Sequence, residues 1–64
     1  MKVKLHHPPR ETSIKGPKRV GQVLTELAIF PETVLVIRGD ELIPEDEVVR
    51  DDDTIEIRPV ISGG

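Results

Sequence analysis

Several residue types are missing or scarce in this chain of 64 residues, and each absence excludes a class of function. Without cysteine there is no disulfide, no thiolate metal site and no cysteine nucleophile. Phe30 is the only aromatic residue, so the chain has no set of rings on which nucleic-acid bases could stack. The net charge of −3 also disfavours nucleic acid as the main partner, because phosphate binding requires a basic surface.

Long apolar runs are absent as well. The longest run contains four apolar residues, far below the roughly 20 needed to span a bilayer. The first seven residues, MKVKLHH, lack the apolar segment of a signal peptide. These two observations predict a soluble, cytoplasmic protein that does not have a membrane as its partner.

The scarcity of thermolabile residues indicates the habitat of the host. The chain has no asparagine, a single glutamine (Gln22) and only its first methionine, while a third of its residues are charged and six are proline. Few thermolabile residues combined with many charges and prolines are typical of proteins from thermophiles.

The pattern of apolar residues predicts several strands and one helix. Alternation or β-branched residues indicate strands over residues 2–6, 10–15, 34–38, 41–43 and 54–58. From Lys18 the apolar residues recur at spacings of three and four, which predicts a helix of about 11 to 13 residues that Pro31 ends. Residues 45–53 are mostly acidic and are expected to form a loop with a helical turn around residues 47–49.

A single helix can cover only one face of a sheet, so this order of elements predicts an α+β fold. A chain of this length forms one domain, here residues 1–59, with a flexible tail over residues 60–64. The core is expected to contain the apolar residues that face the interior: Val3, Leu5, Ile14, Val20, Val23, Leu24, Leu27, Leu35, Ile37, Leu42, Ile55 and Ile57.

The strand over residues 34–38 is expected to carry a docking surface. If Leu35 and Ile37 face the helix, the period of two places Val34 and Val36 on the open face of the sheet. An exposed pair of valines among charges is typical of a partner-binding patch, although strand propensity alone also explains β-branched residues there. The charged residues expected on the same face are Lys2, Lys4, His6, Glu56 and Arg58.

The chain closes on Pro59-Val60-Ile61-Ser62-Gly63-Gly64, where a strand-like stretch runs into two glycines. A sheet gripping one helix and closing in this way resembles the β-grasp fold of ubiquitin-like proteins, with a mixed sheet of four to five strands. The sulfur-carrier branch is the most similar: the thiamine-pathway carrier ThiS, the molybdopterin-synthase small subunit MoaD and the small archaeal modifier proteins.

Three stretches carry this resemblance. Residues 20–27 resemble the helix motif of ThiS, residues 34–44 its central hairpin, and residues 51–64 its acidic turn, last strand and tail. Asp52 stands where the family usually has glycine, and aspartate tolerates left-handed backbone geometry better than most residues. The acidic turn, last strand and closing diglycine together are the most specific part of the match.

The resemblance implies a carrier that is not itself an enzyme. In this family an adenylating enzyme, similar to the ubiquitin-activating enzymes, uses ATP to join AMP to the terminal carboxylate, which here is that of Gly64. A sulfur donor such as a cysteine desulfurase then displaces AMP and leaves a thiocarboxylate. A sulfur-accepting synthase receives the sulfur, and the carrier, a monomer when alone, binds no cofactor tightly.

The destination of the sulfur is expected to be thiamine thiazole synthesis. Molybdopterin synthesis, tRNA thiolation and conjugation to protein lysines are the alternatives that the same resemblance leaves open. A function of another class is a β-grasp interaction module whose diglycine is incidental, and a third is the regulatory piece of a larger enzyme complex.

The residues near the tail are expected to have separate roles. Gly63 and Ser62 would thread a narrow channel towards ATP, because glycine has no side chain that clashes. Val60 and Ile61 would be apolar anchors in a partner's groove, unless they simply extend the last strand. The expected partner-binding set is completed by Arg58, Val34 and Val36.

Other polar residues do not predict a site. His6 and His7 are adjacent, and adjacent strand residues point to opposite faces, so they do not predict a metal site. The acidic groups at residues 45–47 and 51–53 lack the pattern of a calcium loop. The sequence also has no P-loop and no recognisable setting for a catalytic triad.

Overall fold

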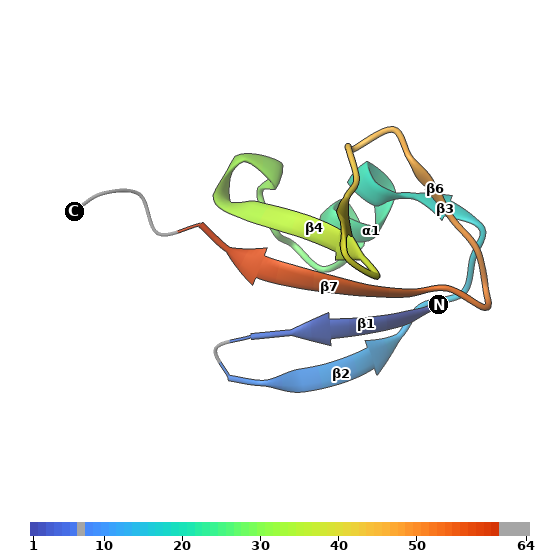
Figure 1. Ribbon diagram of the computed structural model, residues 1–64, viewed down its shortest axis with the longest axis horizontal. Coiled ribbons are helices and arrows are strands. Elements are labelled where there is room, and N and C mark those ends of the chain that lie inside the picture. The colour runs from blue at the N-terminus through green and yellow to red at the C-terminus, as the bar shows by residue number, and fades with distance from the viewer. Residues whose placement is uncertain (7, 61–64) are drawn as a thin grey trace.

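The fold is a mixed sheet with one short helix across one of its faces (Figure 1). The computed structural model describes residues 1–6 and 8–60. In chain order, these residues form β1 (Lys2–Leu5), β2 (Arg10–Ser13), β3 (Lys18–Arg19), α1 (Val20–Glu26), the 3₁₀ turn η1 (Pro31–Thr33), β4 (Val34–Arg38), β5 (Glu41–Leu42), β6 (Val48–Val49) and β7 (Thr54–Pro59). No helix in this part of the chain is long and apolar enough to cross a membrane.

The main sheet has five strands in the order β2-β1-β7-β4-β5. The strands β1 and β7, from the two ends of the chain, lie side by side and parallel, and the other pairs are antiparallel. The prediction of an α+β fold with a mixed sheet of four to five strands and one helix is thereby confirmed. A separate two-stranded ladder joins β3 to β6.

The core lies between α1 and the sheet. The helix contributes Val20, Val23 and Leu24, each at most 1% exposed. The other buried apolar residues are Met1, Val3, Leu5, Ile14, Val36, Ile43, Val49, Ile55 and Ile57, with Leu27, Ile29 and Val34 packed partly against them. Burial of these side chains is the main force that holds so small a domain together.

The faces of β4 are the reverse of the sequence prediction. The register pairs Val36 with Ile57 and Leu35 with Arg58, and residues that lie directly opposite share a face of the sheet. Val36 is therefore buried, Val34 packs partly against the core, and Leu35 is 45% exposed. The predicted exposure of the two valines was wrong because a run of four apolar residues has no alternation, so its pairing with β7 decides which side faces inward.

The helix ends at Glu26, well before Pro31. The N–H of Ile29 donates to the carbonyl of Leu24 at 2.8 Å, and the N–H of Ala28 donates to that of Thr25 at 3.0 Å. These two bonds form a Schellman motif, which satisfies the last carbonyls of the helix and turns the chain away from it. The prediction of 11 to 13 helical residues was therefore too long.

Ala28 occupies the position of the Schellman motif that usually holds glycine, with a φ of 59°. Its Cβ strains this left-handed backbone, and Ala28→Gly would relieve that strain. Glycine also makes the unfolded chain more flexible, which offsets part of the gain, so we expect the free energy of unfolding to rise by about 0.5–1 kcal/mol. Thermal unfolding should then occur roughly 2–8 °C higher.

The control for this prediction is the reverse substitution, glycine to alanine, at Gly39 in the turn between β4 and β5. Its φ is +69° and an added Cβ would meet nothing within 4 Å, so Gly39→Ala should lower stability by backbone strain alone. An unfolding midpoint that fell with Ala28→Gly would contradict the assigned left-handed geometry of Ala28.

The acidic segment over residues 45–53 contains a strand where a helical turn was expected. Val49 in β6 is fully buried, and the backbone carbonyls of Glu47 and Glu45 accept hydrogen bonds from the N–H groups of Val20 and Gly21, both at 2.9 Å. The segment thus satisfies the first donors of α1, which have no partner within the helix. The predicted helical turn was wrong because two strand residues are too few to show a period.

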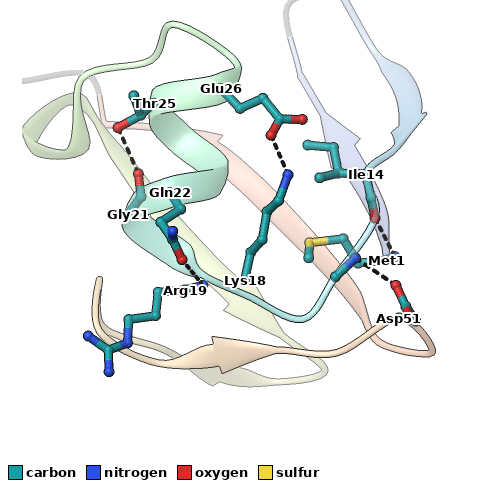
Figure 2. Close-up of polar contacts among 10 residues, drawn as sticks. Met1, Ile14, Lys18, Arg19, Gly21, Gln22, Thr25, Glu26 and Asp51 are labelled. Atoms are coloured by element: carbon teal, nitrogen blue, oxygen red, sulfur yellow. Dashed lines mark hydrogen bonds and ion pairs between the residues drawn. The ribbon is translucent and has the colours of Figure 1, made fainter.

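Side chains also fix the start of α1 (Figure 2). The amide oxygen of Gln22 accepts from the N–H of Arg19 at 3.0 Å, and the hydroxyl of Thr25 donates to the carbonyl of Gly21 at 2.9 Å. At the end of β4, the guanidinium of Arg38 donates to the carboxylate of Glu47 and to the carbonyl of Val48. The bond to Glu47 is the main cause that raises the pKa of Arg38.

Candidate functional site

Val60, which follows the last strand β7, is tied to the body of the fold by a backbone hydrogen bond. The N–H of Val60 donates to the carbonyl of Thr33 at 2.8 Å, which continues the pairing of β7 one residue beyond Pro59. The side chain of Val60 is 44% exposed. Thr33 is itself held in η1, because its N–H and its hydroxyl both donate to the carbonyl of Phe30, at 3.0 and 2.6 Å.

The predicted roles of Ile61, Ser62, Gly63 and Gly64 fall on residues outside those that the structure describes. The geometry that bears on them is therefore that of Val60, which fixes where these four residues begin. The backbone bond from Val60 to Thr33 agrees with the alternative that this residue extends the last strand, while its exposed side chain remains accessible to a partner.

The open face of the sheet carries an apolar patch, which we define as Leu35, Ile37 and Leu42. Ile37 of β4 lies directly opposite Leu42 of β5, so both side chains are on the same face. Leu42 is 61% exposed and Leu35 is 45% exposed, whereas Ile37 is half-buried. The sequence predicted a docking patch on this face but assigned it to Val34 and Val36, which the register turns inward.

Charged residues border the apolar patch, as the period of two predicted. Lys4 of β1 is paired with Glu56 of β7, which is in turn opposite Ile37. Arg58 is opposite Leu35 and its side chain is 57% exposed. Lys4, Glu56 and Ile37 also line one shallow hollow, which shows that charged and apolar side chains meet on this face.

Glu56 is the centre of the polar contacts on the open face. Its carboxylate accepts hydrogen bonds from Nε2 of His6 at 2.6 Å and from Nε of Arg58 at 3.0 Å. Both bonds lower the pKa of Glu56, and the bond from His6 is the larger cause. The pairing orients Arg58 beside the apolar patch and gives His6 a carboxylate partner.

The lowered pKa of Glu56 predicts how stability depends on pH. Because the carboxylate is favoured in the folded state, its contribution is fully present above about pH 4.3, the usual pKa of Glu, and is lost as the pH falls through the lowered folded value. Glu56→Gln should therefore lower stability at neutral pH and flatten the acid limb of the stability curve.

Urea unfolding of the wild type and of Glu56→Gln from pH 2 to pH 7 would measure this difference. Glu32→Gln is the matched control, since Glu32 is exposed and its carboxylate has no hydrogen-bond partner among residues 1–6 and 8–60. A stability difference between wild type and Glu56→Gln that persisted to the lowest pH would contradict the assigned contacts.

Metal binding finds no support in the part of the chain that the structure describes. Within residues 1–6 and 8–60, no group of three or more His, Asp or Glu side chains is placed to hold a metal ion. The imidazole of His6 is bonded to Glu56, and His7 lies outside the described residues.

Comparison with known proteins decides the family. The model of the ThiS family matches residues 3–64, which include the closing diglycine. The chain belongs to the ThiS family. A similar protein from Thermus thermophilus, named sulfur carrier protein TtuB, is 45% identical over 65 residues that span the whole of both chains.

Membership of the ThiS family confirms the resemblance that the sequence showed to ubiquitin-like sulfur carriers. It also confirms the β-grasp assignment, with α1 held across the mixed sheet. Sequence reasoning missed the outward direction of Leu35 and the bond between Val60 and Thr33. The prediction that Leu42 belongs to the core was also wrong: Leu42 lies opposite Ile37 across the turn at Gly39-Asp40, so it follows Ile37 onto the open face.

Proposed function

We propose that this ThiS-family chain is a sulfur carrier whose Gly64 carboxylate is adenylated and then converted to a thiocarboxylate. The observation that carries the proposal is the family match over residues 3–64, which extends through the diglycine. The name of the relative from Thermus, a sulfur carrier protein aligned over its full length, supports it. In this proposal residues 1–59 form the body that partners bind, and residues 60–64 form the reactive tail.

The proposed chemistry takes place at the carboxyl carbon of Gly64. A carboxylate is a poor electrophile, so one of its oxygens first attacks the α-phosphorus of ATP and pyrophosphate leaves. The carboxyl carbon of the resulting mixed anhydride is then attacked by hydrosulfide that the donor supplies; a C–S bond replaces the C–O bond to AMP, AMP leaves, and the thiocarboxylate remains. ATP belongs to the activating enzyme, and Gly63 and Ser62 provide a slim approach to its nucleotide site because neither has a large side chain.

A partner that activates the chain needs a surface on its body as well as the tail. The apolar patch fits this role, because an exposed cluster of Leu35, Ile37 and Leu42 beside the positive charges of Lys4 and Arg58 offers both apolar area and orientation. On addition of the activating enzyme, the NMR signals of these residues should shift and those of the acidic segment should not. Shifts confined to the acidic segment would contradict this docking face.

An assay of ATP–pyrophosphate exchange tests the proposed activation directly. With the host's adenylating enzyme present, exchange of labelled pyrophosphate into ATP should depend on the concentration of this chain. An interaction module with an incidental diglycine would leave the exchange rate at the level of the enzyme alone. Exchange that is independent of the chain at all concentrations would reject the carrier function.

The proposed acceptor is the synthase of the thiamine thiazole, and the alternatives are tRNA thiolation, molybdopterin synthesis and conjugation to protein lysines. The relative's name indicates sulfur carriage and leaves the acceptor open. Offering the thiocarboxylate form to each of the host's acceptor systems, with a radioactive sulfur label in the tail, would distinguish them. Label in tRNA and none in the thiazole would replace the thiamine assignment.

A further inference from the structure

Phe30 is the most exposed large apolar residue among those that the structure describes. It is the only aromatic residue of the chain and is 72% exposed. The helix α1 ends at Glu26 in a Schellman turn, and Phe30, four residues further along the chain, is not part of the core. A single exposed apolar residue is ordinary, but an exposed ring that lines an apolar hollow with its neighbours marks a candidate binding surface.

The backbone beneath Phe30 is fixed. Its carbonyl accepts two hydrogen bonds from Thr33, one from the N–H and one from the hydroxyl. Pro31 follows immediately and restricts the backbone of its predecessor to extended conformations, in agreement with the φ of −77° and ψ of 127° at Phe30. A partner that binds Phe30 therefore does not have to order the backbone that carries the ring.

An open apolar hollow lies next to the ring. Phe30 and Pro31 line it together with Thr25, Ala28 and Ile29, so that it runs from the end of α1 to the start of η1. Glu32 is exposed and follows Pro31 in the chain, so a negatively charged residue is adjacent in sequence to this surface. The surface therefore fits an apolar socket that has a basic group at its rim.

The chain after Val60 is short, which limits how far from this surface an enzyme that acts on Gly64 can lie. Val60 is bonded to Thr33, one turn of 3₁₀ helix away from Phe30, and Figure 1 shows the end of β7 beside the green turn that contains these residues. Only residues 61–64 separate Val60 from the carboxyl of Gly64. Four residues reach at most about 14 Å when fully extended.

We propose that Phe30 is an anchor by which the adenylating enzyme binds the chain, with the ring inserted in an apolar socket of that enzyme. This inference rests on the proposed carrier function. Because the carboxyl of Gly64 lies at most about 14 Å along the chain from Val60, the protein around the nucleotide site must come against the body near Val60. Phe30 and Pro31 are apolar side chains that line the surface there, on the η1 side.

The experiment compares Phe30→Ala with the wild type in the ATP–pyrophosphate exchange assay, at varied concentrations of the chain. We expect the KM for the chain to rise about tenfold, as for loss of an aromatic anchor, with kcat unchanged. Phe30→Leu, which keeps an apolar side chain, should give an intermediate KM. Val48→Ala is the matched control, since Val48 is also exposed, at 42%, but lies on β6 at the other end of the molecule (Figure 1).

The thermal unfolding midpoint of Phe30→Ala distinguishes a loss of binding from a loss of stability. It should stay near that of the wild type because the ring is largely in solvent. A KM for Phe30→Ala within twofold of the wild-type value, or a loss confined to kcat, would overturn the anchor. If the wild type itself supports no exchange, the proposed carrier function fails, and that outcome differs from an active wild type with an unaffected Phe30→Ala variant.

Discussion

Deletion of Gly64 is expected to abolish ATP-dependent activation and to leave the thermal midpoint of the protein unchanged. The deletion moves the terminal carboxyl back by one residue, about 3.5 Å. A misplacement of 1 Å can already cost about 100-fold in rate, so the kcat/KM for activation should fall by at least about 100-fold. Stability should not change, because every buried apolar side chain of the described core lies between Met1 and Ile57.

The deletion is measured by pyrophosphate exchange and by differential scanning calorimetry on the same samples. Gly64→Ala is the matched control, because it keeps the length of the tail and adds only one methyl group near the reacting carbon. It should retain more activity than the deletion. A deletion variant that is still activated at the wild-type rate, or that unfolds many degrees lower, would show that the carboxyl of Gly64 does not have the proposed role.

The second large effect is expected at Val49, where Val49→Asp should prevent stable folding. Val49 is fully buried in β6, so the substitution places an unpaired carboxylate in the core. Such a change costs at least about 4 kcal/mol. A domain of this size has a total stability on the order of 3–10 kcal/mol, so little or none of it would remain.

The adjacent residue supplies the control for Val49→Asp. Val48 is 42% exposed, and Val48→Asp should change stability by no more than about 0.5 kcal/mol. Circular dichroism with urea titration of both variants would compare them. Equal stability of the two variants would mean that β6 does not pair with β3 as described, since that pairing directs one valine inward and the other outward.

The parts of the fold that the sequence predicted correctly are those with a clear period. Val3 and Leu5 in β1, like Ile55 and Ile57 in β7, alternate with polar residues, and all four are buried. The apolar stripe of α1 likewise predicted the burial of its three core residues. In each case the local pattern alone identifies the inward face.

The parts that the sequence did not predict depend on contacts between distant segments. The inward side of β4 is set by its register with β7, which pairs Val36 with Ile57, far apart in the sequence. The end of α1 is set by a backbone motif at Ala28, where alanine gives no warning of a left-handed conformation. The strand β6 is two residues long and is stabilised by β3.

The candidate site shows the same division. Period two placed Lys4, Glu56 and Arg58 on the open face, and the register confirms them there. The apolar patch on that face was expected, but its residues were assigned to the wrong side of β4. The bond between Val60 and Thr33 could not be predicted from the sequence, because it joins two segments that have no local pattern in common.

The intact mass of the protein tests the central claim most directly. The chain is incubated with its host's adenylating enzyme, ATP and a sulfur donor, and is then weighed by mass spectrometry beside a sample without ATP. Conversion of the Gly64 carboxylate to a thiocarboxylate predicts a gain of about 16 Da, as sulfur replaces one oxygen, confined to the peptide that ends in Gly64. A mass that stays the same with and without ATP, under conditions in which the enzyme activates another carrier, would contradict the proposed function.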